Sequence, residues 1–145
     1  MKVNFKKLSP TAITPTKAHT TDAGFDLFSD EEVILTYGET AAIKTNIAIE
    51  LPEGYVADVR PRSGLTLNTG LRVHYGTVDS GYRNGIGIIC ENGDHGALCN
   101  RTVRIKKGQK IAQLVILPIP EIELKEVNEL SDSDRGVNGF GSTGI

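Results

Sequence analysis

The sequence contains no tryptophan and only four phenylalanines and four tyrosines, so a hydrophobic core must consist mainly of Ile, Val and Leu. Its two cysteines, Cys90 and Cys99, are too few and too loosely spaced for a disulfide framework or a zinc site, and we interpret them as free thiols. No N-terminal signal peptide is recognisable. The longest apolar stretch, 111–119, is interrupted by Gln113 and Pro118 and is too short to span a bilayer. These absences predict a cytoplasmic protein without a membrane segment.

The chain also lacks a strong excess of charge of either sign. Its 16 Lys and Arg residues nearly balance 18 Asp and Glu residues, which gives a formal net charge of -2. Because no long basic run is present, direct binding of nucleic acid is not expected. The length of 145 residues, with 39% hydrophobic and 23% charged residues, predicts one globular domain rather than a disordered chain.

Most of the sequence is typical of short β-strands. The segments rich in Val and Ile are 33–35, 41–50, 55–60, 86–90, 102–105 and 111–117. Gly, Pro, Asn and Asp separate them, as they do at turns. From Ile43 to Glu50 apolar residues and Thr45 alternate with mostly polar ones, which is the period of a half-buried strand. Only the segment after Arg62 could form a helical turn or two. The pattern predicts an all-β sandwich, jelly roll or barrel.

The composition changes near the C-terminus, after Leu130. We therefore divide the chain into a β domain, 1–130, and a glycine-rich arm, 131–145. By composition alone such an end is typical of a frayed terminus. Its glycines could nevertheless bring backbone N–H groups close to phosphate oxygens, and Arg135 would add a guanidinium group. Phe140 among these glycines suits stacking on a base. The ending of a Walker A loop is missing.

Two upstream segments contain candidate phosphate ligands and a candidate base. In "RPRSGLTL", Arg62, Ser63 and Gly64 directly follow a strand, where a guanidinium, a hydroxyl and free amides could hold phosphate. The alternative is a capped turn in which Ser63 begins a short helix. In "GTVDSGYRNG", Asp79 ends a short apolar strand and could orient a water or accept its proton; the alternative is ordinary turn chemistry. Tyr82 could pack against a sugar or close the edge of the core.

A further segment, "TTDAGFDLFS", places Asp26 between two apolar strand residues. Burying a carboxylate alone is costly, so Asp26 needs a metal or a cationic partner. The arginines available for such a pair are Arg62, Arg72 and Arg83.

Taken together and in order, five segments resemble the motifs of the trimeric dUTP pyrophosphatase (dUTPase) family. They are "DAGFDLFS", "PRSGLTL", "GTVDSGYRNG", "KKGQKIAQLVI" and "RGVNGFGSTG", and they run from about Thr21 to Gly144. The resemblance implies a distorted jelly-roll subunit and a homotrimer whose active sites are shared between subunits. It also implies Mg²⁺-assisted hydrolysis of dUTP to dUMP and pyrophosphate, which keeps uracil out of DNA and supplies dUMP for thymidylate synthesis.

The resemblance also implies a role for each matching residue. Asp79 matches the catalytic aspartate that positions and deprotonates the attacking water, and Tyr82 lies under the deoxyribose. Asp26 acts near the magnesium through water. The other positions match substrate-binding residues: the backbone of a hairpin that includes Val73, Gly76, Thr77 and Val78 at the uracil; Arg62, Ser63, Gly64 and Gln113 at the phosphates; and Arg135, Phe140, Gly141, Ser142 and Thr143 in the arm.

Two alternatives remain, and the motifs depart in places from the family pattern, among them Asn84-Gly85 in the third motif. The related dCTP deaminases use a catalytic glutamate at the position of Ile89, and Glu91 lies two residues further on the same strand face. The complete fifth motif favours dUTP hydrolysis over deamination. A nucleotide-binding regulatory module is a second alternative, against which the presence of Asp79 and Tyr82 argues. The fourth motif has Gln109-Lys110 where Asp-Arg is usual, which leaves a local side-chain pair in question.

Overall fold

The computed structural model describes residues 1–93, 102–134 and 136. Within them, the chain forms eleven strands and one short helix. The strands are β1 (Asn4–Lys7), β2 (Phe25–Phe28), β3 (Val33–Leu35), β4 (Thr40–Lys44), β5 (Ile47–Glu50), β6 (Tyr55–Pro61), β7 (Leu71–Val73), β8 (Gly76–Val78), β9 (Gly87–Asn92), β10 (Val103–Ile105) and β11 (Lys110–Pro118). The helix α1 (Ser63–Asn68) lies between β6 and β7. In this described part, no helix is long and apolar enough to cross a membrane.

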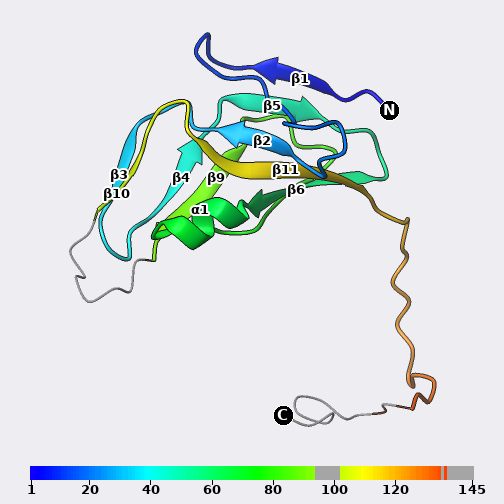
Figure 1. Cartoon of the computed structure of the whole chain (residues 1–145). Helices are drawn as coiled ribbons and strands as arrows, with labels where there is room; N and C mark the ends of the chain where they lie inside the picture. The colour runs from blue at the N-terminus through cyan, green and yellow to red at the C-terminus, as the bar shows by residue number, and fades with distance from the viewer. Residues whose placement is uncertain (94–101, 135, 137–145) are drawn as a thin grey trace.

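All of the described strand pairs are antiparallel, and they form two main sheets. The larger has the order β2-β11-β6-β8, and the second has the order β4-β9-β7. Two further pairs, β1-β5 and β3-β10, extend the body at its top and at its left (Figure 1). The prediction of an all-β fold is confirmed. Beyond β11 the chain runs away from the strands, and no helix or strand lies between 119 and 134 (Figure 1).

The core lies between these sheets and consists of aliphatic side chains, as the absence of tryptophan predicted. Its fully buried members include Leu27, Leu35, Ile43, Ile88 and Ile111, which come from five different strands. Each such side chain contributes about 1.5–3 kcal/mol through removal of apolar surface from water. Cys90 is a buried free thiol in the same cluster, and burial raises its pKa to about 12.

The segment 41–50, predicted as one strand, is divided between β4 and β5. Asn46 lies between them with a φ of 52°, the left-handed conformation that asparagine tolerates. Its side-chain amide donates a hydrogen bond to Asp30 Oδ2 at 2.6 Å. The Thr45 hydroxyl donates to the Ile86 carbonyl at 2.7 Å. The predicted alternation holds except at Ala48: the odd positions from 43 to 49 are all buried, Lys44 and Glu50 are exposed, and Ala48 is buried as well.

The predicted hairpin from Val73 to Val78 is also wrong in its pairing. β7 pairs with β9 in one sheet, whereas β8 pairs with β6 in the other. The turn at His74 and Tyr75 therefore carries the chain from one sheet to the next. This crossing leaves the backbone of β8 at the edge of the larger sheet, beside a cavity described below.

Candidate functional site

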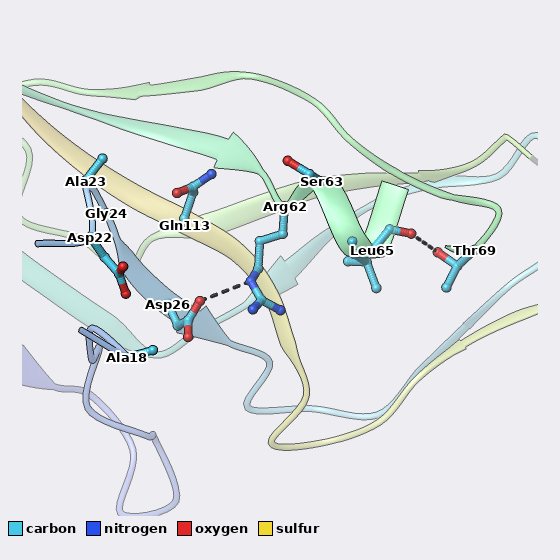
Figure 2. A pocket seen from close by; sticks show the side chains of 11 residues that line it. Ala18, Asp22, Ala23, Gly24, Asp26, Arg62, Ser63, Leu65, Thr69 and Gln113 are labelled. Atoms are coloured by element: carbon cyan, nitrogen blue, oxygen red, sulfur yellow. Dashed lines mark hydrogen bonds and ion pairs between the residues drawn. The ribbon is translucent and has the colours of Figure 1, made fainter. Parts of the chain in front are cut away.

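A cavity of about 490 Å³ opens beside the first turn of α1, and we call it the α1 cavity. Figure 2 shows Asp26, Arg62, Ser63 and Gln113 around this space. Gly64 also lines it. The structure therefore brings together five predicted residues from three elements, β2, β11 and the junction of β6 with α1.

The pairing of β2 with β11 places polar side chains on the cavity face. Asp26 lies opposite Gln113, and cross-strand partners share one face of a sheet. The register shifts between Lys110 and Ala112, which is a β-bulge with one extra residue. Residues three apart, such as Lys110 and Gln113, point to opposite faces of a regular strand. The extra residue places both side chains on the same face of β11. The bulge thus brings the Lys110 ammonium group to the Asp26 carboxylate.

Asp26 is paired through both of its carboxylate oxygens. Arg62 Nε lies 3.0 Å from Oδ1, and Lys110 Nζ lies 2.8 Å from Oδ2. The Asp26 side chain is only 14% exposed, which explains why it needs cationic partners. Of the arginines considered from the sequence, Arg62 is the one that pairs with it. Lys110 supplies a second cation, which compensates the carboxylate if Arg62 turns toward a ligand.

The start of α1 presents backbone donors to the same cavity. Arg62 is the N-cap with extended backbone angles, and within the described part of the chain no side-chain hydrogen bond caps the helix. The first amides of a helix have no acceptor within it, so those of Ser63 and Gly64 remain available. A Cβ added at Gly64 would meet no atom of the described residues within 4 Å, so these residues leave the approach open. Ser63 therefore begins the helix, as one alternative anticipated, but does not cap it.

Gly24 supports this cavity in a way that the sequence analysis missed. A Cβ at this position would lie 3.0 Å from Gln113 Oε1 and 3.0 Å from Val115 Cγ2. Any larger residue just before β2 would therefore push against β11, whereas glycine allows the close approach. The side chain of Gln113 is itself fixed by a hydrogen bond, which its Nε2 donates to the Pro61 carbonyl at 3.0 Å. Gly24 was visible in the sequence between Asp22 and Asp26, but only the packing reveals its purpose.

A second cavity, of about 290 Å³, lies along β8, and we call it the β8 cavity. The predicted residues that line it are Gly76, Thr77, Val78, Asp79 and Tyr82. The lining residues that the sequence analysis did not assign to the site are Val59, His74, Ile86, Gly87 and Ile89. Val73, which was predicted with the first group, is instead buried in β7 and does not line the cavity.

Asp79 follows the buried end of β8 and is exposed. Its carboxylate has no hydrogen-bond or ion-pair partner among the described residues, so it is available to accept a proton or to orient a water. Tyr82 N–H donates to the Asp79 carbonyl at 3.1 Å, and Tyr82 O–H donates to the Gly85 carbonyl at 3.1 Å. The ring of Tyr82 is thus fixed at both ends next to Asp79, while 42% of the residue remains exposed.

In β9, Ile89 stands at the position where dCTP deaminases have their catalytic glutamate. Ile89 lines the β8 cavity there with an aliphatic side chain. Glu91 shares its face of the strand, as predicted, but lies outside the cavity lining. The Glu91 carboxylate instead contacts His74, with 3.1 Å between Oε2 and Nε2. Deamination therefore finds no carboxylate at the expected position.

The two cavities have no lining residue in common. The structure thus gathers the predicted site residues into two groups, with Asp79 and Tyr82 in one and Asp26 and Arg62 in the other. The predicted arm residues Arg135, Phe140, Gly141, Ser142 and Thr143 lie outside the described residues.

Comparison with known proteins identifies the family. The family model described as dUTPase matches residues 11–144. A protein of Clostridioides difficile named deoxyuridine 5'-triphosphate nucleotidohydrolase is 51% identical over 97% of this chain and 96% of its own length. The solved structure of Staphylococcus bacteriophage 80alpha dUTPase with dUpNHpp has a TM-score of 0.91 and 40% identity, and covers 99% of both chains. A mutant dUTPase from phage phi11 of S. aureus, whose structure concerns the coordination of a structural Mg(II) ion, has a TM-score of 0.84 and 35% identity, and covers 91% of this chain and 100% of its own. The chain therefore belongs to the dUTPase family.

Proposed function

We propose that the chain hydrolyses dUTP to dUMP and pyrophosphate, as a dUTP diphosphatase. The observation that carries the proposal is the carboxylate of Asp79, which has no partner among residues 1–93, 102–134 and 136, beside the ring of Tyr82 in the β8 cavity. The names of the relatives and the analogue-bound phage structure support the same substrate. Such a reaction removes a source of uracil in DNA and supplies dUMP for thymidylate synthesis.

The nucleoside is expected in the β8 cavity. Tyr82 would pack against the deoxyribose, and the edge-strand backbone of Gly76, Thr77 and Val78 would bond the uracil edge. Asp79 would hold the attacking water and take its proton as the oxygen approaches the α-phosphorus. A positioned general base supplies about 10²–10⁴-fold in rate, so binding and charge neutralisation must supply the rest.

The phosphates are expected in the α1 cavity. The amides of Ser63 and Gly64 and the guanidinium of Arg62 are donors suited to phosphate oxygens. Gln113 would add its side-chain amide. When Arg62 turns from Asp26 to a phosphate, Lys110 still pairs with the carboxylate, so the half-buried charge of Asp26 keeps a cationic partner.

The dUTPase family generally uses Mg²⁺, and two carboxylates, Asp22 and Asp26, line the α1 cavity; oxygen is the ligand that Mg²⁺ prefers. The Asp22 carboxylate already accepts the His19 N–H at 2.8 Å, and the described residues contain no group of three or more His, Cys, Asp or Glu side chains that could hold the ion directly. Both oxygens of Asp26 already pair with cations, which suits contact through a water rather than direct coordination. Bound Mg²⁺ would neutralise part of the triphosphate charge.

We further propose that the chain works as a homotrimer in which one copy supplies the β8 cavity and another the α1 cavity. The separation of the two groups of residues within one chain supports this sharing. The arm, 131–145, would close over the completed site. In it, Arg135 would contact the terminal phosphate, Phe140 would cover the uracil, and Gly141, Ser142 and Thr143 would surround the triphosphate. A cytoplasmic location and the absence of nucleic-acid binding stay predictions.

Incubation with dUTP and Mg²⁺, followed by anion-exchange chromatography, tests the reaction. We expect dUMP and pyrophosphate in equal amounts, and little product when EDTA removes the metal. The Glu91→Gln variant is a matched control, because its carboxylate lies outside the cavity lining and should not matter for hydrolysis. If the wild type instead releases ammonia from dCTP and the Glu91→Gln variant does not, the protein is a dCTP deaminase.

A further inference from the structure

The turn at His74 and Tyr75 is unusual because the strands that it joins do not pair with each other. β7 is bonded to β9, and β8 is bonded to β6. On the side of β9, His74 N–H donates to the Ile89 carbonyl at 2.9 Å. The turn therefore needs a second attachment on the side of β6, since no ladder between β7 and β8 closes it.

Three side chains provide this second attachment, and we call them the Asp58–Arg60–Tyr75 cluster. The Tyr75 hydroxyl donates to Asp58 Oδ2. Arg60 donates from Nη2 to the same carboxylate oxygen at 2.7 Å and from Nε to the Tyr75 hydroxyl at 3.0 Å. Its guanidinium carbon also lies 5.6 Å from the centroid of the Tyr75 ring. Asp58 and Arg60 are two residues apart on β6 and so project from the same face.

The charge of Asp58 makes this attachment strong. Asp58 is only 7% exposed. Burial alone would raise its pKa, but the hydrogen bonds from Tyr75 and Arg60 outweigh burial and lower the pKa below its ordinary value. The carboxylate is therefore ionised at neutral pH, and a hydroxyl bonded to a carboxylate is among the stronger hydrogen bonds in proteins.

The cluster lies directly beside the strand that lines the β8 cavity. β8 is an edge strand, joined to β6 by three residue pairs: Val78 with Ala57, Thr77 with Asp58, and Gly76 with Val59. Tyr75 is the next residue beyond the last pair. So short an edge strand is held weakly by its own ladder. The bond from Tyr75 to Asp58 extends the attachment at the end of β8 that is remote from Asp79.

We propose that Tyr75 is a positioning residue that sets base selectivity: through Asp58, it fixes the backbone of β8 against which the base is read. The inference rests on the proposed function, because it assumes that the base lies along β8. Hydrogen bonds from backbone groups discriminate bases only if those groups hold their positions. The phosphate contacts belong to the α1 cavity, and Asp79 follows the opposite end of β8 from Tyr75, so turnover depends less on Tyr75.

The Tyr75→Phe variant removes only the hydroxyl group. We expect a KM for dUTP about tenfold higher, a kcat close to that of the wild type, and a ratio of kcat/KM for dUTP over dCTP about tenfold lower, which corresponds to one lost charged hydrogen bond. Asp58→Asn should have an intermediate effect, since it keeps an acceptor. Tyr55→Phe is the matched control, because Tyr55 lies on β6 and its hydroxyl has no partner among the described residues; it should resemble the wild type.

An unchanged dUTP:dCTP ratio in Tyr75→Phe would overturn the proposal, and so would an equal loss of kcat for both nucleotides, which indicates general loss of structure. Calorimetric titration with dUMP and dCMP separates this question from the proposed function. If the wild type binds dUMP selectively but does not hydrolyse dUTP, only the proposed function fails. If Tyr75→Phe binds the two monophosphates as selectively as the wild type, only the positioning role fails.

Discussion

The carboxylate of Asp79 can be changed with little effect on the rest of the molecule. It is exposed and has no partner among the described residues, so Asp79→Asn breaks no hydrogen bond or ion pair that these residues form. Asparagine has nearly the same shape. Substitutions at such surface positions usually change the free energy of unfolding by less than about 0.5 kcal/mol. Any large loss of activity in this variant therefore reports on the reaction rather than on folding.

The expected loss follows from the role of the carboxylate. An amide cannot take the proton of the attacking water, so the general-base contribution of about 10²–10⁴-fold disappears, which is about 3–5 kcal/mol of transition-state stabilisation. Substrate binding should persist, because the phosphate donors belong to the α1 cavity and Tyr82 is unchanged. We therefore expect kcat to fall by this factor with a similar dissociation constant for dUTP.

Pyrophosphate release under single-turnover conditions gives the rate, and titration with non-hydrolysable dUpNHpp gives the affinity. Thermal melting of wild type and variant serves as the control for folding. A kcat close to that of the wild type would refute the assignment of Asp79 as the base. A large loss of dUpNHpp affinity with unchanged kcat would show that Asp79 binds substrate instead.

Two further predictions concern the arm and the acid stability of the fold. Truncation after Leu130 should leave a trimer with an unchanged melting temperature and little dUTP turnover, and an unaffected rate would remove the arm from the mechanism. Hydrogen bonds from Asn46 and Thr11, together with Lys107, hold the pKa of Asp30 well below its usual range. Its contribution to stability is thus present above the unfolded-state pKa of about 3.9 and is lost as the pH falls toward the lower folded-state pKa. Asp30→Asn should reduce the free energy of unfolding by about 1–3 kcal/mol at neutral pH, and urea titrations should show the difference from the wild type shrinking below pH 4; an equal difference at every pH would contradict this.

Local patterns in the sequence predict the strands well, because alternation and turn residues act over short distances. The burial of odd positions from 43 to 49 follows directly from the period of two. The break at Asn46 does not follow from this period. It depends on hydrogen bonds from Asn46 to Asp30 and from Thr45 to Ile86, which form only in the folded chain. The same holds for the β-bulge before Ala112. Nothing local in the sequence marks the residue at which the register of β11 shifts.

The candidate site was predictable in its parts but not in its assembly. The motifs predicted that Asp26, Arg62 and Gln113 act together, and the structure places them around one cavity. They did not reveal Lys110 as the second partner of Asp26, because that contact depends on the bulge. The role of Tyr75 depends on a contact with Asp58, 17 residues earlier in the chain, and so has no local signal.

The central claim is that the active site combines the β8 cavity of one copy with the α1 cavity of another. Mixing two inactive variants, Asp79→Asn and Arg62→Ala, after joint unfolding and refolding tests it directly. In a mixed trimer, some sites pair an intact Asp79 from one copy with an intact Arg62 from the next. With equal amounts and random assembly, we predict recovery of about a quarter of the wild-type dUTP hydrolysis. If mixed trimers form but show no more activity than the separate variants, each chain builds its own site and the claim is wrong.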